Sequence, residues 1–350
     1  MRALRDRIDA IDDQILALVN ERAQLARQIG ELKGAGPVYR PEREAQVLRR
    51  LRTGNPGPLP GETVEHLFTE VISACRSLED AMSVAFLGPR GTFSEEAAHK
   101  RFGGSVDSVP CGSIDEVFRQ VEARQVGFGV VPVENSTDGA VGRTLDLLLA
   151  TPARICGEVL LQVHQCLMSR STDGRAIGRI YAHSQSLAQC HEWLNLNHPK
   201  AERIAVVSNA EAARVASQEE GAASIGSRAA AAVYSLQLLA ENIEDNPNNT
   251  TRFVVIAHQD VPRSGRDKTS LVMSARNRPD AMHDLLTPFA QHGVSMTRLE
   301  SRPSRTGMWE YVFFVDIEGH QQDASVAAAL DLLRERASFL KILGSYPAAN

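Results

Sequence analysis

Near residue 250 the chain combines amides, hydroxyls and one arginine at the start of an apolar strand. Residues 246–253 read NPNNTTRF and run directly into the apolar residues 254–257. Turn-forming Asn and Pro account for a loop, but not for two threonines beside an arginine whose charge is permanent. Such groups suit a small anionic substrate, so we expect a binding cleft here.

A second candidate site lies in residues 2–34, where apolar residues recur at alternating spacings of four and three. This is the heptad seam of a long helix. At position 22 the seam carries an arginine. Taking about 100° per residue of helix, Lys33 lies roughly 20° from Arg22, so both cations can face one pocket. Arg5 is better placed to serve the pocket of a partner chain.

Arg22 has an alternative explanation as a polar seam residue that fixes register and oligomeric state, although burying an unpaired charge is costly. Two more helices are expected, one from Pro41 and one over residues 62–80, with Cys75 and Glu79 on one face of the last. Because three helices make a thin bundle, we expect a homodimer or a larger homo-oligomer.

In residues 83–259, short apolar strands each end in a polar cluster and then enter an alanine-rich helix. This alternation predicts an α/β sheet, mostly parallel, with a ligand crevice at the carboxyl ends of its strands. Free amides at helix N-termini favour a carboxylate or phosphate, whereas helix capping would explain Ser94, Ser208 and Ser227 individually. The clusters are residues 91–94, 134–137, 183–186, 208–211 and 226–227.

This segment contains no Walker loop, nucleophile elbow, His-Glu-x-x-His motif or full dinucleotide fingerprint. Its histidines lack a metal-ligand spacing. We therefore expect no metal and no cofactor. The site either only binds its ligand or acts on a substrate that decomposes readily.

The composition sets further bounds on the 350-residue chain, whose length suggests two or three domains, and we expect three. A net charge of -5 without a long basic run argues against nucleic acid as a partner, and no apolar stretch is long enough to span a membrane. Five widely spaced cysteines argue against a disulfide framework and predict a cytoplasmic location.

After a linker at 261–266, residues 268–350 read strand, helix, strand, strand, helix, strand. This order is the ferredoxin-like βαββαβ arrangement, which fixes no function by itself. We expect an all-α domain at 1–82, an α/β domain at 83–259 and a ferredoxin-like α+β domain at 268–350.

Three sets of motifs resemble known families. Residues 88–94 (GPRGTFS), 131–136 (VPVENS) and 249–253 (NTTRF) are similar to the prephenate dehydratases, whose domain is two-lobed with a cleft. Residues 300–303 (ESRP) and 343–347 (LGSYP) resemble the fused ACT domain, and the basic first helix resembles the all-helical chorismate mutases. Together they resemble the bifunctional enzymes of phenylalanine biosynthesis over nearly the whole chain.

The resemblance implies that the helical domain rearranges chorismate to prephenate, a step that needs orientation and charge stabilisation but no nucleophile. Arg22, with Arg5 from the other protomer, would hold the carboxylates. Lys33 and Glu79 would meet the breaking ether oxygen, and Glu44 would hold the ring hydroxyl. The further contacts implied are Arg40, Arg43 and Cys75.

Arg40, Cys75 and Glu79 depart from the enteric pattern of the family, which has an acidic residue, a serine and a glutamine there. A glutamine always offers a hydrogen-bond donor, whereas a glutamate does so only when protonated. We therefore expect mutase activity to fall as pH rises and Glu79→Gln to flatten the pH–rate profile.

For the α/β domain, the resemblance implies that prephenate loses carbon dioxide and hydroxide to give phenylpyruvate. Formation of the aromatic ring drives this step, so a weak acid suffices. Thr251 would assist departure of the hydroxyl, Arg252 would hold a carboxylate and Phe253 would shape the cleft. The further contacts implied are Ser94, Asn135, Ser136 and Gln185.

For the last domain, the resemblance implies phenylalanine as an effector. The turn that senses it reads Gly-Ala-Leu in the family but Asp280-Ala281-Met282 here, and an added carboxylate would either repel the ligand or point to solvent. We expect feedback inhibition that is present but weakened. The regulatory residues implied are Asp280, Ala281, Met282, Ser295, Glu300, Ser301, Arg302 and Pro303.

Two other functions remain compatible with the residues. A two-lobed cleft joined to an ACT module could sense a ligand without turnover, or an active mutase could carry an inactive dehydratase.

Overall fold

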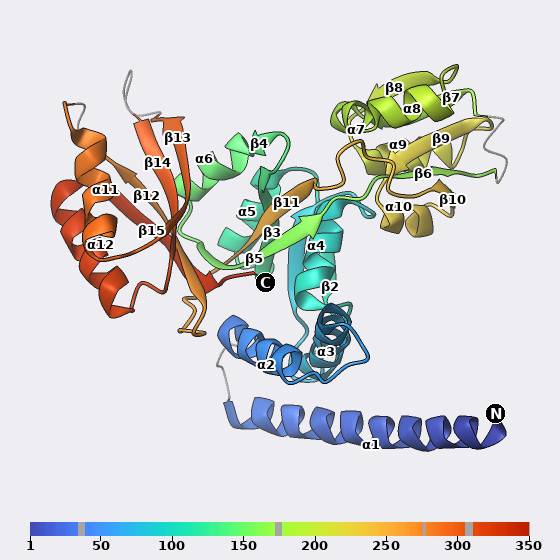
Figure 1. Ribbon diagram of the computed structural model, residues 1–350, viewed down its shortest axis with the longest axis horizontal. Helices are drawn as coiled ribbons and strands as arrows, with labels where there is room; N and C mark the ends of the chain where they lie inside the picture. Colours follow the sequence, from blue (N-terminus) through green and yellow to red (C-terminus); the bar gives the residue numbers. More distant parts are fainter. Residues whose placement is uncertain (34–38, 172–176, 276–277, 305–310, 350) are drawn as a thin grey trace.

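The computed structural model describes the 350-residue chain except residues 34–38, 172–176, 276–277, 305–310 and 350. A helical domain comes first, then two lobes that each contain a sheet, and then a third sheet with two helices (Figure 1). The multidomain fold class expected from the sequence is confirmed.

The helical domain is built from one long and two shorter helices, and α1 extends well beyond the other two (Figure 1). Pro41 opens α2, where its missing N–H is harmless. The third helix ends earlier than expected, because the N–H of Glu79 bonds the carbonyl of Arg76 over 2.9 Å in a tighter turn. The prediction that Cys75 and Glu79 share one helix is therefore wrong. The bounds are α1 (Arg2–Lys33), α2 (Pro41–Thr53) and α3 (Gly61–Arg76).

The sheet of the first lobe has the strand order β2-β1-β3-β11-β5, with β4 paired to β3. Strand β11 runs antiparallel to both of its neighbours, so the expectation of a mostly parallel sheet is wrong for this lobe. The reason is that the chain returns from the second lobe to insert β11 between β3 and β5. The elements are β1 (Ser83–Leu87), α4 (Phe93–Phe102), β2 (Asp107–Cys111), α5 (Ile114–Glu122), β3 (Phe128–Asn135), β4 (Gly139–Ala140), α6 (Gly142–Ala150), β5 (Arg154–Gln162) and β11 (Thr250–Ala257).

The second lobe contains a sheet of order β10-β6-β9-β7-β8. The oxygens of Ser208 and Ser227 cap its helices α9 and α10, which confirms the capping interpretation for both. In the first lobe Thr92, and not Ser94, caps α4. The elements are β6 (Cys166–Ser169), β7 (Arg179–His183), α7 (Ser184–Gln189), α8 (His191–Asn197), β8 (Glu202–Val206), α9 (Asn209–Ala216), β9 (Ala222–Gly226), α10 (Arg228–Val233) and β10 (Gln237–Ala240).

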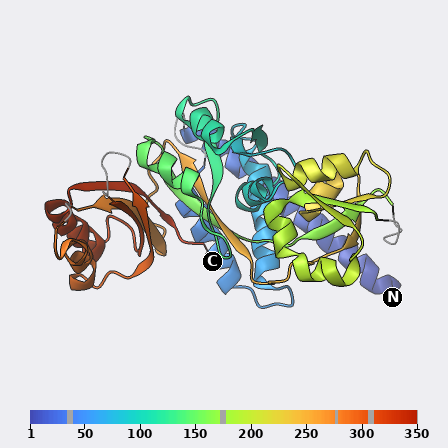
Figure 2. The same cartoon turned by 90° about the horizontal axis from the view of Figure 1, so that it is seen from above.

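The last domain has the expected βαββαβ order and an antiparallel sheet, β13-β14-β12-β15. Both helices cover one face of this sheet, and the other face packs Val272 and Phe314 into the core of the first lobe. The domain lies at the opposite end of the molecule from the second lobe (Figures 1 and 2). The elements are β12 (Asp267–Ser274), α11 (Ala281–Gln291), β13 (Met296–Pro303), β14 (Tyr311–Glu318), α12 (Ala324–Arg336) and β15 (Phe339–Pro347).

None of the helices in the described part of the chain is long and apolar enough to cross a bilayer.

Candidate functional sites

The first lobe presents a hydroxyl and two amides where β3 ends and β11 begins. Thr251 lies opposite Asn135 in the sheet, and the Asn135 side-chain amide donates to Thr251 Oγ1 and to Asn249 Oδ1, each over 2.8 Å. The backbone N–H groups of residues 137 and 138 donate to the side-chain oxygen Oδ1 of Asn135. Because Thr251 accepts from Asn135, its own hydroxyl proton remains available to a substrate. Asn249 Nδ2 is buried and has no hydrogen-bond partner.

The second lobe meets this group through helix α7. The side-chain amide of Gln185 donates to Asp138 Oδ2, and Gln189 donates to the same oxygen over 3.2 Å. Asp138 and Gln189 were not identified from the sequence. The sequence offered only weak indications of them: Asp138 follows Asn135 by three residues, and Gln189 lies one helical turn beyond Gln185.

The other polar clusters hold loops in place. Ser136 Oγ accepts from the N–H of Thr250 over 3.0 Å, which ties β3 to β11. Asn209 donates to Ser186 Oγ over 2.7 Å within the second lobe. Ser94 is buried in the first turn of α4. The structure thus brings Asn135, Ser136 and Thr251 together, with Gln185 reaching them through Asp138.

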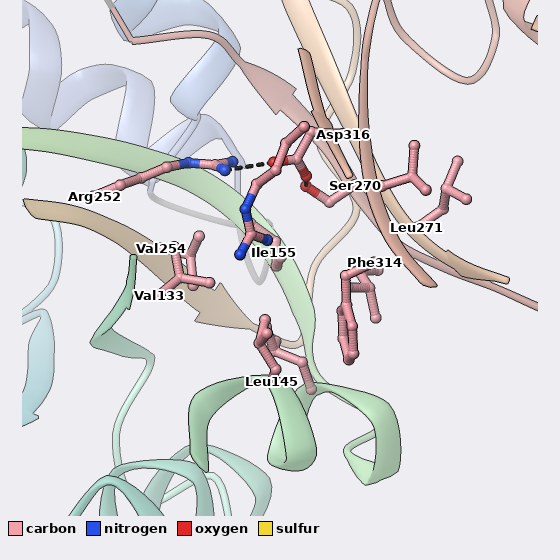
Figure 3. Close-up of a pocket in the computed structure, with 13 residues that line it drawn as sticks. Val133, Leu145, Ile155, Arg252, Val254, Ser270, Leu271, Phe314 and Asp316 are labelled. Atoms are coloured by element: carbon pink, nitrogen blue, oxygen red, sulfur yellow. Dashed lines mark hydrogen bonds and ion pairs between the residues drawn. The ribbon is translucent and has the colours of Figure 1, made fainter. Parts of the chain in front are cut away.

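Arg252 is directed away from this group of side chains and toward the C-terminal domain. Its Nε donates to Glu158 over 2.8 Å, Nη1 to Asp316, and Nη2 to the Tyr346 hydroxyl over 2.9 Å. In Figure 3 the guanidinium and the Asp316 carboxylate point toward each other across the domain boundary. The adjacent cavity of about 10 Å³ is no larger than one water needs. In this arrangement Nε, Nη1 and Nη2 of Arg252 all have protein partners, and the role of Arg252 in holding a substrate carboxylate stays a prediction.

The charged side chains at this boundary between the first lobe and the C-terminal domain stabilise one another. Burial alone would raise the pKa of Asp316, but Arg252 and Ser270 outweigh it and hold the pKa below its ordinary value. Lys268 adds a second cation, 2.8 Å from Glu158. Phe253, the next residue along β11, is buried in the apolar core rather than exposed as a cleft wall.

In the helical domain, Arg22, Glu44 and Glu79 come from three different segments. Arg22 is close enough to lower the pKa of Glu44, although burial has the larger effect and raises that pKa. Glu79 packs against α1, where a Cβ placed on Gly30 would lie 3.1 Å from Glu79 Cγ. Its Oε2 atom is buried and unpartnered. The Lys33 side chain lies outside the described residues.

The remaining residues predicted for this site have different surroundings. Arg40 pairs with Glu42 over 2.8 Å, Arg43 is exposed, and Cys75 is buried. Arg76, which the sequence did not single out, donates to Glu44 from α3. No sequence signal pointed to it, because the two residues are 32 positions apart.

Arg5 lies far along α1 from Arg22, about 25 Å away at the usual rise per residue. Between and beyond them the apolar seam of α1 is exposed, from 48% for Ile29 to 87% for Leu32. The other exposed seam residues are Leu4, Ile8, Ile11, Ile15, Leu18 and Leu25.

In the C-terminal domain, Asp280 is exposed and adopts a left-handed backbone, with φ 65°, just before α11. Arg302 and Arg298 on β13 reach the first lobe, pairing with Asp146 over 3.2 Å and with Glu134 over 2.9 Å. The other expected regulatory residues are exposed (Ser295, Ser301, Pro303) or half-buried (Ala281, Met282, Glu300).

Within the described residues, no three His, Cys, Asp or Glu side chains are grouped so that they could hold a metal ion. All five cysteines are unpaired and buried.

Three family models match successive parts of the chain. Residues 4–80 match chorismate mutase type II, residues 84–261 match prephenate dehydratase, and residues 269–331 match the ACT domain.

Proteins of this combined type are similar to the chain over its full length. A bifunctional chorismate mutase/prephenate dehydratase from Neisseria gonorrhoeae is 55% identical over 350 residues, covering 99% of this chain and 96% of that protein. One from Pseudomonas aeruginosa is 49% identical, covering 100% and 98%. The crystal structure of a prephenate dehydratase from Arthrobacter aurescens in complex with L-Phe is 34% identical with a TM-score of 0.70, covering 77% of this chain and 90% of that one.

Proposed function

Since the chain belongs to the bifunctional chorismate mutase/prephenate dehydratases, we propose that its helical site makes prephenate and its two-lobed site consumes it. The observation that carries the proposal is the contrast between the two sites. One gathers cations and carboxylates from three helical segments, and the other aligns one hydroxyl with neutral amides. Neither reaction needs more than these groups supply.

Thr251 is the hydrogen-bond donor that assists the dehydratase reaction. As the ring carboxylate leaves as carbon dioxide, its electron pair completes the aromatic ring and the ring hydroxyl departs as hydroxide. The Thr251 hydroxyl, whose proton is free because Oγ1 accepts from Asn135, donates a hydrogen bond to that departing oxygen and keeps its own proton, while the released hydroxide is protonated by solvent. Gln185 supplies a further hydrogen bond to the substrate, and Asn135 holds the Thr251 hydroxyl in place through its fully hydrogen-bonded side-chain amide.

Arg252 positions Thr251 instead of contacting prephenate. The two residues are neighbours on β11, and side chains alternate between the faces of a strand. The bonds of Arg252 to Glu158, Asp316 and Tyr346 support this assignment. The C-terminal domain thus holds in place β11, the strand that carries Thr251.

The mutase site is completed by a second copy of the chain. The exposed seam of α1 supports a homodimer, because the eight large apolar side chains of this seam are exposed in the single chain. Pairing along this seam brings Arg5 of one protomer to Arg22 of the other. Glu44 then holds the ring hydroxyl and Glu79 the ether oxygen.

The C-terminal domain senses phenylalanine, as the L-Phe complex of the related dehydratase supports. Arg298 and Arg302 connect the predicted effector strand directly to the first lobe, which gives the ligand a short route to the catalytic sheet. We place the protein in the cytoplasm, where buried free thiols stay reduced; cell fractionation tests the location.

Adding chorismate to variants separates the two reactions. Arg22→Ala is expected to form no prephenate yet still convert supplied prephenate. Thr251→Ala should accumulate prephenate, with dehydratase kcat reduced by about a hundredfold or more, the usual contribution of a positioned hydrogen-bond donor. Thr250→Ala is the matched control and should retain its activity. A wild-type chain that makes neither product would be a sensor without turnover.

Shared mutase sites can be tested by complementation. Arg5→Ala and Arg22→Ala are each expected to be inactive, but a co-expressed mixture forms heterodimers that contain one intact site. Random pairing predicts recovery of about a quarter of wild-type mutase activity. No recovery would mean that Arg5 serves its own chain or that the seam does not pair.

Calorimetry with phenylalanine tests the effector site. We expect weak binding that tightens in Asp280→Gly, because glycine removes the carboxylate and suits the left-handed backbone at φ 65°. Asp331→Asn, a surface change on α12 of the same domain, serves as the control. Tight binding that Asp280→Gly leaves unchanged contradicts the expected weakening.

A further inference from the structure

Arg76 is a buried cation at the boundary between the helical domain and the first lobe. Its side chain is 6% exposed, and Nη1 donates to Oε1 of Glu44, which is 16% exposed. Its Nη2 donates over 2.7 Å to the backbone carbonyl of Phe102, the last residue of α4. One planar group therefore connects the mutase carboxylate to the end of a dehydratase helix.

Aromatic packing fixes the position of this guanidinium. Its central carbon lies 5.2 Å from the centre of the Tyr39 ring. That ring packs against Phe102 and Phe128, with centroids 5.0 Å apart in both pairs. Arg101 of α4 donates to the Tyr39 hydroxyl over 2.7 Å. Because the stacked ring is anchored in the dehydratase lobe, Arg76 cannot turn away from Glu44 without disturbing that lobe.

Three arginines, each from a different helix, face the Glu44 carboxylate. They are Arg76 from α3, Arg101 from α4 and Arg22 from α1, with the neutral Tyr39 hydroxyl ahead of α2. Burial raises the pKa of Glu44, and the three arginines oppose this rise, Arg76 most strongly. Loss of Arg76 would therefore favour the protonated carboxyl.

We propose that Arg76 is a positioning residue of the mutase reaction, which aims Glu44 at the substrate and takes its own anchor from the dehydratase domain. This inference rests on the proposed role of Glu44 in holding the ring hydroxyl of chorismate. Its consequence is that α4 of the dehydratase lobe helps to position a side chain of the mutase site.

The test compares mutase kcat/KM against pH in the full-length wild type, Arg76→Met and Arg76→Lys. If the ionised Glu44 is the active form, activity falls as pH drops through its pKa. Arg76→Met should lower activity at neutral pH by about tenfold or more, the effect of losing a charged hydrogen bond, and should move the fall to higher pH. Arg76→Lys keeps the cation and should restore most of the original pH profile.

Controls separate positioning from folding. Dehydratase activity on supplied prephenate reports on the fold and should persist in Arg76→Met. Arg52→Met, which removes a half-exposed arginine paired with Glu65 across α2 and α3, should change neither activity. If Arg76→Met loses both activities, Arg101→Met provides the second test. This change removes a charge near Glu44 that does not hydrogen-bond to it, and it should still move the fall in mutase activity to higher pH.

Two results would overturn the inference. One is an Arg76→Met profile reduced equally at every pH, the signature of a purely structural role. The other is full mutase activity in Arg76→Met while Glu44→Gln is impaired. Full activity in Glu44→Gln would instead refute the proposed role of Glu44 itself, so the two failures are distinguishable.

Discussion

The buried ion pairs around Arg252 are the interaction on which the arrangement of the catalytic sheet depends. Arg252, Glu158 and Asp316 are all withdrawn from solvent, with side chains 11%, 1% and 6% exposed. Removing one partner of a buried pair typically destabilises by about 3–5 kcal/mol, because the other charge is left uncompensated. These pairs therefore fix the position of the C-terminal sheet against the sheet of the first lobe. Because Arg252 lies on β11, they also fix the position of its neighbour on this strand, Thr251.

The joint between the helical domain and the first lobe follows the same physical design. There too an arginine, Arg76, bridges a carboxylate of one domain and a polar group of the next. Close packing against a glycine accompanies both boundaries: a Cβ on Gly344 would lie 2.0 Å from the Ile155 carbonyl oxygen, and one on Gly103 would lie 2.4 Å from the side-chain Cβ of Ser73. Buried contacts thus join the helical domain to the first lobe, and the first lobe to the C-terminal domain.

Local patterns predicted much of this protein. The long first helix, the strand-to-helix alternation and the βαββαβ order each depend on neighbouring residues and are confirmed. Asn135 and Thr251 were predicted separately, and sheet register brings them together. The direction of Arg252 was missed, although strand alternation implies that it cannot face the same side as Thr251. Arg76 could not be found, because its partners Glu44 and Phe102 are distant in sequence and belong to different domains.

The most direct test of Arg252 is a double-mutant cycle on dehydratase kcat/KM with supplied prephenate, using Arg252→Gln, Asp316→Asn and both together. If Arg252 acts by joining β11 to the C-terminal sheet, each single change lowers activity and the double variant is little worse than the more impaired single one. If Arg252 contacts the substrate, Asp316→Asn keeps nearly full activity while Arg252→Gln raises KM for prephenate, and that result would contradict the account.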